Sequence, residues 1–448
     1  MSTTRLSALD ASFLAVESAE SPMHVGWVAT FDGPGPGFAV LRDHLAERLE
    51  GIPRYRQKLA PVPLGLHEPV WADDPRFDPA EHLLHAQGAD LDAIVDGILS
   101  TPLPRDRPLW QMWIADELPD DRVALIGKMH HCMVDGAAVA ELGRRILDAA
   151  PDAESPAGPE WRAPAPAPSP RARLARGALD RASDGARLAL TPARLAAAPG
   201  RIRELPGLAR TMAHTLLPPA PDSSLNAAGA AARRHVRVSR SLDDLRAVRR
   251  RFGVSPNDVV LAACAGGLRR LAEIRGERPR RLKVMVPADV RSAEDDAGAG
   301  NRISFAFLEL PCDEPDALAR LEAIHATTAQ RQRDGDAEDL DAAFGLLALT
   351  PSPIQRALAH AFAHPRMSNL TISSVAGPAV PRYLHGCRLR EVHSAVPLSS
   401  RHALSIGVVI VAGRVCFGLF ADAQTLPDAD ELGEDVGAAF DELLALAA

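Results

Sequence analysis

The sequence predicts an α/β protein that is built from two domains. At 448 residues the chain is longer than one typical hydrophobic core, and 46% hydrophobic with 24% charged residues is ordinary globular composition. Short apolar runs of strand length alternate with helical periodicity in residues 1–150 and again in residues 233–448. We therefore expect an N-terminal domain (1–150), a C-terminal domain (233–448) and a connecting segment (151–232).

The connecting segment differs in composition from both domains. Residues 151–170 hold seven prolines, which predicts an extended linker. Residues 171–210 hold nine arginines against three acidic residues, and Arg187, Arg194 and Arg201 recur every seven residues. This pattern predicts a basic amphipathic helix, interrupted near its prolines Pro192 and Pro199. The helix would be either a solvated crossover between the domains or a surface that docks on anionic lipid.

Several local elements are predicted by periodicity and end signals. Residues 122–130 have the length of a strand, and the helical pattern of 137–150 follows. A strand at 281–291, a hairpin at 402–422 turning at Ala412-Gly413, and helices at 241–253 and 256–274 are expected in the second half. The stretch between the first strand and its helix is therefore a loop outside a strand end, where ligands commonly bind in α/β proteins.

That loop carries two adjacent histidines in the stretch "GKMHHCMVDGAA" (127–138). Side chains of neighbouring residues on an extended backbone point to opposite sides, so His130 and His131 are not expected to share a metal ion, and we predict no metal site. In a purely structural interpretation Asp135 caps the following helix, Gly136 eases the turn and one histidine is hydrogen-bonded in the core. The other interpretation makes one imidazole a catalytic base. Cys132 is a weaker candidate for a nucleophile, because it points away from His131.

A neutral imidazole suits the role of a general base at neutral pH. Its unperturbed pKa is about 6.5, and a positioned base typically contributes about 10²–10⁴-fold to a rate. No nucleophile motif such as GxSxG accompanies the histidines, so direct transfer without an acyl-enzyme is the simpler chemistry.

Composition limits the partners and the compartment. A net charge of −8 argues against a general nucleic-acid binder. The five cysteines are scattered and never spaced as CxxC, which argues against a disulfide framework and fits a reducing compartment. Asp10 and Glu17 interrupt the apolar stretch that a signal peptide needs, and no apolar run approaches the roughly 20 residues of a membrane span. We expect a cytoplasmic protein.

The motif HHxxxDG at 130–136 resembles that of the CoA-dependent acyltransferase superfamily, which includes chloramphenicol acetyltransferase and peptide-synthetase condensation domains. Further stretches, in order, are similar to those of the bacterial wax ester synthase/diacylglycerol acyltransferases within it. They are "LSALDASFLAVESAESPMHVG" (6–26), "PLW" (108–110), "PNDVVLA" (256–262), "VPADVR" (286–291), "GN" (300–301), "NLTISSVAGP" (369–378) and "FGLFAD" (417–422). The chain departs from the family pattern at Ser374 and Ala376, where Asn and Pro are expected.

The resemblance implies two chloramphenicol-acetyltransferase-like domains, each a mixed β-sheet flanked by helices, with the active-site channel at their interface. It implies that His131 is the general base, that His130 and Gly136 support it, and that Asp135 is a structural residue. Arg291 is our candidate for the ion-pair partner of Asp135; a buried pair of this kind would cost about 3–5 kcal/mol if one partner were removed.

Other residues have weaker assignments. Asn257 and Asp258 either shape the cleft or, in the case of Asn257, cap the helix that follows. Ser373 or Ser374 is a candidate donor to the developing oxyanion, a contribution of about 3 kcal/mol in analogous sites. Two further residues lie in family motifs. Trp110 is expected to pack or, because it lies in the motif that the family associates with its acceptor side, to contact the substrate; His24 is expected to be a buried structural histidine.

The function that the resemblance implies is a long-chain acyl-CoA:alcohol O-acyltransferase, making triacylglycerol or wax esters. Acyl-CoA is the donor substrate and no cofactor is expected; the acceptor would be a diacylglycerol or a long-chain alcohol. Because such products are insoluble, peripheral contact with the inner membrane face or a lipid droplet is expected. The alternatives are a condensation-type enzyme with a carrier-bound acyl donor and a non-catalytic lipid-surface protein.

Overall fold

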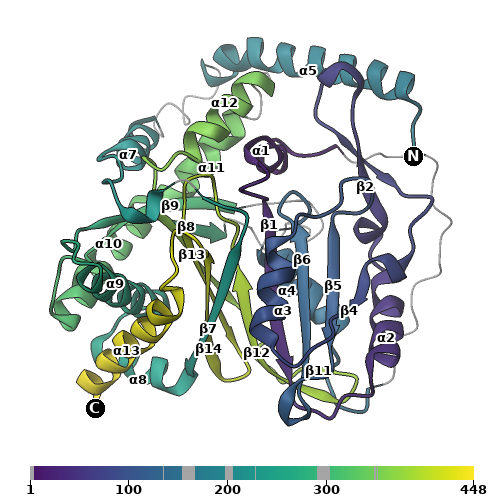
Figure 1. The fold of residues 1–448 in the computed structure, drawn as a ribbon. Helices are drawn as coiled ribbons and strands as arrows, with labels where there is room; N and C mark the ends of the chain where they lie inside the picture. Colours follow the sequence, from purple (N-terminus) through teal and green to yellow (C-terminus); the bar gives the residue numbers. More distant parts are fainter. Residues whose placement is uncertain are drawn as a thin grey trace.

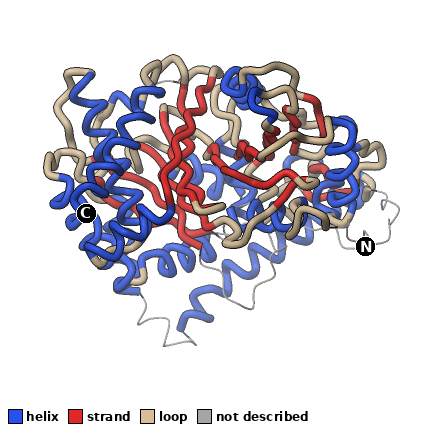
Figure 2. Tube along the Cα trace, turned by 90° about the horizontal axis from the view of Figure 1, so that it is seen from below, coloured by secondary structure: helices blue, strands red, loops and turns tan. Residues whose placement is uncertain are grey.

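Two six-stranded mixed sheets lie side by side in the computed structural model and form the body of the molecule (Figure 1). The structure describes residues 5–134, 136–153, 167–196, 205–227, 229–289, 303–347, 350 and 352–448. Seen from below, the strands form two groups with helices on the outside (Figure 2). The expected α/β class and the pair of mixed sheets flanked by helices are confirmed.

The first sheet has the order β11-β12-β1-β6-β5-β4, and only its β4–β5 pair is parallel. Its strands are β1 (His24–Phe31), β4 (Leu83–His85), β5 (Trp110–Ala115), β6 (Val123–His130), β11 (Tyr383–Leu384) and β12 (Cys387–Ala395). Strand β6 is buried along its whole length, because both of its faces are covered. Val123, Leu125 and Met129 point to one core, and Ala124 and Ile126 to the other.

Helices cover both faces of this sheet. The helices are α2 (Phe38–Glu50), α3 (Leu91–Ser100) and α4 (Gly136–Ile146). Leucines of α2 and α4 join the core that contains Met129, whereas Val95 and Leu99 of α3 join the other core. A two-stranded ribbon, β2 (Gln57–Ala60) and β3 (Val70–Asp73), lies beside the sheet. Short 3₁₀ turns are η1 (Pro53–Arg56), η2 (Pro63–Gly65), η3 (Pro79–Glu81), η4 (Pro119–Asp121) and η5 (Ser224–Asn226).

The second sheet has the order β7-β14-β13-β10-β8-β9. Its strands are β7 (Arg233–Ser241), β8 (Leu282–Asp289), β9 (Ile303–Leu310), β10 (Leu370–Ala376), β13 (Leu404–Val411) and β14 (Arg414–Asp422). The predicted hairpin is confirmed: β13 and β14 are joined by Ala412 and Gly413, both with positive φ, as a tight two-residue turn requires. One face carries α8 (Leu242–Phe252), α9 (Pro256–Ile274), α10 (Ala317–Asp334) and α13 (Ala429–Ala447).

The division of the chain at residue 233 needs one correction. Strands β11 and β12, which the sequence placed with the C-terminal domain (233–448), complete the first sheet, where β12 pairs with β1. Sheet membership is decided by pairing between strands about 365 residues apart, and local periodicity carries no information about that pairing. The two halves are therefore interlocked by one exchanged hairpin and are not simply joined by a linker.

The sheets approach closely where β12 crosses the hairpin β13–β14. Gly407 and Gly418 are register partners, and a Cβ on either would lie 2.2 Å from an atom of Ser394 in β12. Only glycine leaves room for that contact. The seam between the halves is thus set by a glycine pair.

A group of helices gathers at one end of the molecule (Figure 1). They are α1 (Ala8–Val16), α5 (Pro170–Ala196), α7 (Leu205–Leu216), α11 (Asp336–Leu347) and α12 (Ser352–Phe362). The predicted basic helix is present as α5, but it runs unbroken through Pro192, so the expected interruption there is wrong; Pro199 and Arg201 lie outside the described residues. Among the described residues, none of the helices combines the length and apolar character that a membrane crossing requires.

Candidate active site

The motif loop leaves the end of β6 and enters α4, as the sequence predicts. His130 is the last residue of β6 and α4 begins at Gly136, while Asp135 lies outside the described residues. The His130 N–H donates to the Leu109 carbonyl at 2.9 Å, and the His131 N–H donates to the Met23 carbonyl at 2.8 Å. Backbone bonds therefore fix both histidines in place.

The His131 ring is stacked on Phe13 of α1. The ring centroids are 3.9 Å apart and the planes are inclined by 7°. His131 is half-buried, in contrast to the fully buried His130. Its imidazole therefore lies against an aromatic face at the edge of the core.

His130 has the environment of a supporting residue. Its Nδ1 accepts the Cys132 N–H at 3.1 Å, and its Nε2 lies 3.5 Å from Glu17 Oε1. Burial, with a smaller contribution from the Arg105 charge, lowers the pKa of His130 to about 3. The ring is consequently neutral at physiological pH.

One face of α1 carries the groups that surround the motif loop. Glu17, at the end of α1, forms an ion pair with Arg105, and Phe13 lies one turn earlier. Asp10 is buried one further turn back. The side chain of Ser7 caps the helix by accepting the Asp10 N–H at 3.0 Å. Helix α1 is thus held at both ends over the histidine pair.

The Cys132 thiol is unsuited to nucleophilic attack. It is 2% exposed, and burial followed by the charge of Asp10 raises its pKa far above the ordinary value. The thiolate is the reactive form of cysteine, and here it is strongly disfavoured.

An apolar pocket of about 320 Å³ lies against α1. Phe13 and Met23, which both contact His131, belong to its lining. Its walls come from both halves of the chain: Ser7, Ala8, Leu9, Ser12, Phe13, Val16 and Met23 on one side, and Met285, Phe305, Asp341, Phe344, Gly345, Gln355, Leu358, Ala359, Phe362, Ala363 and Ser399 on the other. The interface between the halves therefore contains an apolar space, and one side chain of its lining, Phe13, is stacked on His131.

The start of helix α9 shows the roles of Asn257 and Asp258. The helix begins at Pro256, and Ser255, not Asn257, is the N-cap; Ser255 and Asp258 form a reciprocal capping box. The expected Asn257 cap is wrong. Asp258 is buried and also accepts from Thr328 at 2.6 Å and contacts His325 Nδ1 at 2.8 Å. These contacts make Asp258 a structural residue of the second half.

For four of the remaining predicted residues the expected role is not tested by the structure. Arg291 lies outside the described residues, as Asp135 does, so their pairing stays a prediction. Ser373 and Ser374 lie on β10, which packs against α4. Their oxyanion role also stays a prediction.

Trp110 and His24 lie in the core, as expected. Trp110 is fully buried, donates to the Tyr55 carbonyl at 2.7 Å and stacks on His82. His24 contacts the Leu99 carbonyl through Nε2 at 3.0 Å, and burial, with a smaller effect of Lys128, lowers its pKa to about 3.

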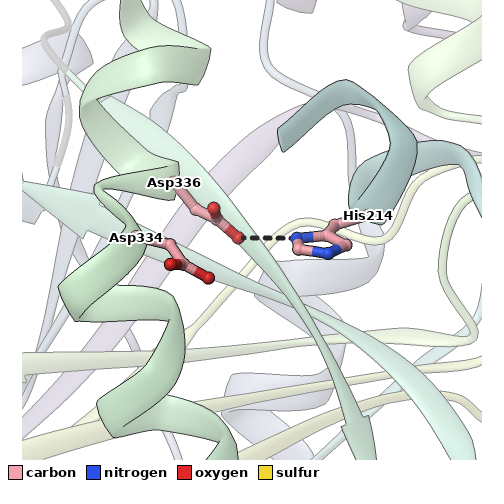
Figure 3. A group of neighbouring side chains, drawn as sticks. All are labelled: His214, Asp334 and Asp336. Carbon is pink, nitrogen blue, oxygen red and sulfur yellow. Dashed lines mark ion pairs between the residues drawn. The ribbon is translucent and has the colours of Figure 1, made fainter. Parts of the chain in front are cut away.

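A second group of titratable side chains, His214, Asp334 and Asp336, lies where α7 meets the α10–α11 junction (Figure 3). Asp336 Oδ2 is 3.6 Å from His214 Nδ1 and 3.0 Å from the guanidinium of Arg331. Asp334 is 3.9 Å from Arg210. Because each carboxylate has an arginine partner, the cluster acts as an ion-pair network that attaches α7 to α11.

Phe13, Glu17 and Arg105 belong to the site, but the sequence reasoning did not single them out. A signal was available: Phe13 and Glu17 are four residues apart, the spacing of neighbours on one helix face, within the stretch 6–26 that resembles the family. The pocket residues of α11 and α12 had no comparable signal, because the contact depends on how the two halves meet.

Fold and motif together define a two-domain acyltransferase whose histidine motif lies at the domain interface. Residues 6–260 match the wax ester synthase/diacylglycerol acyltransferase catalytic domain, and residues 299–444 match the WS/DGAT C-terminal domain. The chain belongs to the wax ester synthase/diacylglycerol acyltransferase family.

Individual relatives agree with this assignment. A Mycobacterium tuberculosis H37Rv protein named as a diacylglycerol O-acyltransferase is 32% identical over 99% of this chain and 97% of its own length. A second protein of that strain with the same activity in its name is 29% identical over 98% and 96%. The wax ester synthase/diacylglycerol acyltransferase of Marinobacter aquaeolei VT8 superposes with a TM-score of 0.71 at 26% identity, covering 99% of both chains. The first condensation domain of the calcium-dependent antibiotic synthetase shares the fold (TM-score 0.58, 18% identity, 100% and 97% covered).

Proposed function

We propose that this acyltransferase joins a long-chain acyl group from CoA to the hydroxyl of a diacylglycerol or long-chain alcohol, with His131 as the general base. The observation that carries the proposal is the position of His131 beside an apolar pocket that both halves line. A pocket of this chemistry suits an alkyl chain, and the base lies against one of its walls.

The reaction needs one base and one developing anion. His131 accepts the hydroxyl proton while the alcohol oxygen attacks the thioester carbonyl, forming a C–O bond and a tetrahedral oxyanion. The oxyanion then collapses, the C–S bond breaks, and the imidazolium returns its proton to the CoA sulfur. Ester and CoA thiol are the products. The buried Cys132 thiol supports a path without an acyl-enzyme.

Activity assays on a matched pair of histidine variants test the base. Purified protein is incubated with palmitoyl-CoA and either hexadecanol or a diacylglycerol, while CoA release and ester formation are measured together. We expect His131→Ala to lower kcat by about 10²–10⁴-fold. His360→Ala, which changes an exposed histidine of α12, is the control and should keep wild-type turnover. Full turnover by His131→Ala would show that the base assignment is wrong.

We also propose that α5 rests on an anionic lipid surface. Its inner side is fixed to the body: Asp184 pairs with Arg5 at 2.8 Å and with His67 at 3.1 Å, and Gly177 packs against Val62. The nearby η2 and α12 expose Leu64 and Ile354.

The outer side of α5 combines apolar and basic groups. Leu179 and Leu190 are 11 residues apart, about three turns, and are 67% and 51% exposed. Arg176 and Arg187 are exposed beside them. Apolar side chains flanked by arginines are the composition of a helix that lies in a lipid interface, and α12 beneath it lines the apolar pocket.

Vesicle flotation tests this surface. Wild-type protein should float with vesicles containing phosphatidylglycerol and less with pure phosphatidylcholine. The double variant Leu179→Asp/Leu190→Asp should lose most of the bound fraction. Leu446→Asp, on the exposed side of α13 and 47% exposed, is the matched control and should float like the wild type. Equal loss in both variants would contradict the assignment to α5.

A further inference from the structure

We propose that Phe13 is a positioning residue that holds the His131 imidazole in its reactive orientation and couples that orientation to the chain in the apolar pocket. The inference rests on the proposed function. Phe13 is the aromatic side chain that both stacks on His131 and lines the pocket.

The first step concerns how firmly Phe13 itself is held. Helix α1 is capped at its start by Ser7 and tied at its end by the Glu17–Arg105 ion pair. The helix also packs along α12, which forms the opposite wall of the pocket. Phe13 therefore has little freedom to move away from the motif loop as a body.

The second step concerns what the stack does to the imidazole. The backbone N–H of His131 is bonded to Met23, which fixes the main chain but does not by itself set the side-chain torsions. A phenyl ring 3.9 Å away and within 7° of parallel restricts rotation of the imidazole on one side. A base held in one orientation is ready for proton transfer, and a misplacement of about 1 Å costs on the order of 10²-fold in rate.

The third step concerns the substrate. A chain in the pocket contacts the same phenyl ring, together with Leu9 and Val16 of α1. When the chain fills the pocket, it presses Phe13 toward the imidazole; a short or absent chain leaves the ring less supported. Phe13 thus links occupation of the pocket to alignment of the base, so its removal should affect kcat more than KM.

Three variants separate this role from simple lining. Phe13→Leu keeps an apolar side chain but loses the flat face, Phe13→Tyr keeps the face, and Phe362→Leu changes another aromatic side chain of the pocket. With palmitoyl-CoA and hexadecanol we expect Phe13→Leu to lower kcat roughly tenfold with KM within about twofold. Phe13→Tyr should retain most of the wild-type kcat, and Phe362→Leu should raise KM with little change in kcat.

A second measurement, which does not depend on turnover, separates a change at His131 from a general loss of folded enzyme. Carbethoxylation of His131 by diethyl pyrocarbonate, followed by peptide mass spectrometry, should be faster in Phe13→Leu than in the wild type and unchanged in Phe13→Tyr. Equal rates in all three, or a change in KM alone for Phe13→Leu, would overturn this inference while leaving the proposed function intact. A wild-type enzyme that transfers no acyl group would overturn the proposed function and this inference together.

Discussion

His130 and His131 are neighbours in the chain, yet they experience different physical surroundings. His130 is enclosed, neutral, and bonded to the Cys132 N–H, whereas His131 lies against Phe13 at the edge of an apolar pocket. The end of strand β6 separates them, because the chain turns at His131. Two identical side chains thus have different environments: one is buried and holds the loop, and the other is stacked on an aromatic ring that lines the apolar pocket.

Substitutions at His130 should therefore act on stability before they act on chemistry. His130→Ala leaves the buried Cys132 N–H without its acceptor and should lower the free energy of unfolding by about 1–3 kcal/mol. His130→Asn places an oxygen near the position of Nδ1 and should recover part of that loss. Urea unfolding of both variants beside His131→Ala is the measurement. A His130→Ala protein as stable as the wild type would contradict the supporting role.

The lysines of this chain share one kind of contact, which in Lys58 accompanies an ion pair with Asp74 at 3.0 Å. Only three of its 50 basic residues are lysines, and all three donate to backbone carbonyl groups. Lys128 Nζ donates to the carbonyls of Ile98 and Thr101, at the end of α3. Lys283 Nζ donates to two carbonyls at the end of α7, those of Thr215 and Pro218. Burial lowers the pKa of Lys128 to about 8. A compact ammonium can fill a site at a helix C-terminus that a planar guanidinium would not fit.

At the scale of an element, α9 shows why a family motif need not mark a site. Burial alone would raise the pKa of Asp258, but hydrogen bonds from Thr328, His325 and Ser255 lower it below the ordinary range. The carboxylate is therefore ionised and fully used in holding α9 to α10.

A pair of substitutions tests that assignment. Asp258→Ala removes a capping box and a buried acceptor, so the free energy of unfolding should fall by about 2 kcal/mol or more. Asn257→Ala, at the neighbouring position without the cap, should change it by less than about 0.5 kcal/mol. KM for both substrates should stay near the wild-type value in each. A raised KM in Asn257→Ala alone would show that Asn257 shapes the substrate cleft.

How well the sequence predicts an element depends on where its determinants lie. The helix expected at 241–253 and the Ala412-Gly413 turn have local determinants, and both are confirmed: Ser241 caps the start of α8, and Gly253 ends it with positive φ. Pro192 was expected to break α5, but the helix continues through it. A proline disfavours a helix by removing one hydrogen bond, and that cost of about 3 kcal/mol can be offset by contacts elsewhere along a helix of 27 residues.

At the scale of the whole molecule, the fold class, the two sheets and the motif loop followed from the sequence, and the seam did not. The exchange of β12 and the wall formed by α11 and α12 arise from contacts between distant segments. The motif pointed to His131, but the ring stacked on it and the pocket lined by that ring depend on how α1 packs against the second half. Local sequence patterns specify individual helices and strands, whereas the contact surface between the two halves depends on side chains that are distant in the sequence.

The interior histidines should make stability depend on pH. Burial lowers the pKa of His24, of His130 and of His235 to about 3 each. Their unfolded values are near 6.5, so between pH 6.5 and about 3 the unfolded chain binds more protons and the free energy of unfolding falls as the pH falls. By pH 5.5 each contributes a loss of about 1 kcal/mol.

Urea midpoints measured from pH 7.5 to 5 test this dependence. His24→Gln, which keeps a donor for the Leu99 carbonyl, should reduce the change of the unfolding free energy with pH by the contribution of about one proton. Midpoints that stay constant from pH 7 to 5.5 would show that these histidines are not neutral in the folded state or are not titrating in the unfolded one.

The glycine pair at the seam gives a test of how far the halves depend on one another. A Cβ at Gly418 would lie 2.2 Å from the Ser394 carbonyl oxygen and 3.0 Å from His235 Nε2. The carbonyl is backbone, so Gly418→Ala forces β12 away from β14 and should lower the free energy of unfolding by about 1–3 kcal/mol. Because the same movement changes the spacing of the two pocket walls, turnover should fall with it. Gly185→Ala in α5, where a Cβ meets open space, is the control and should be neutral or stabilising by up to about 1 kcal/mol. If Gly418→Ala loses stability but keeps full turnover, the site tolerates a shifted seam and the pocket does not depend on the close approach of the sheets.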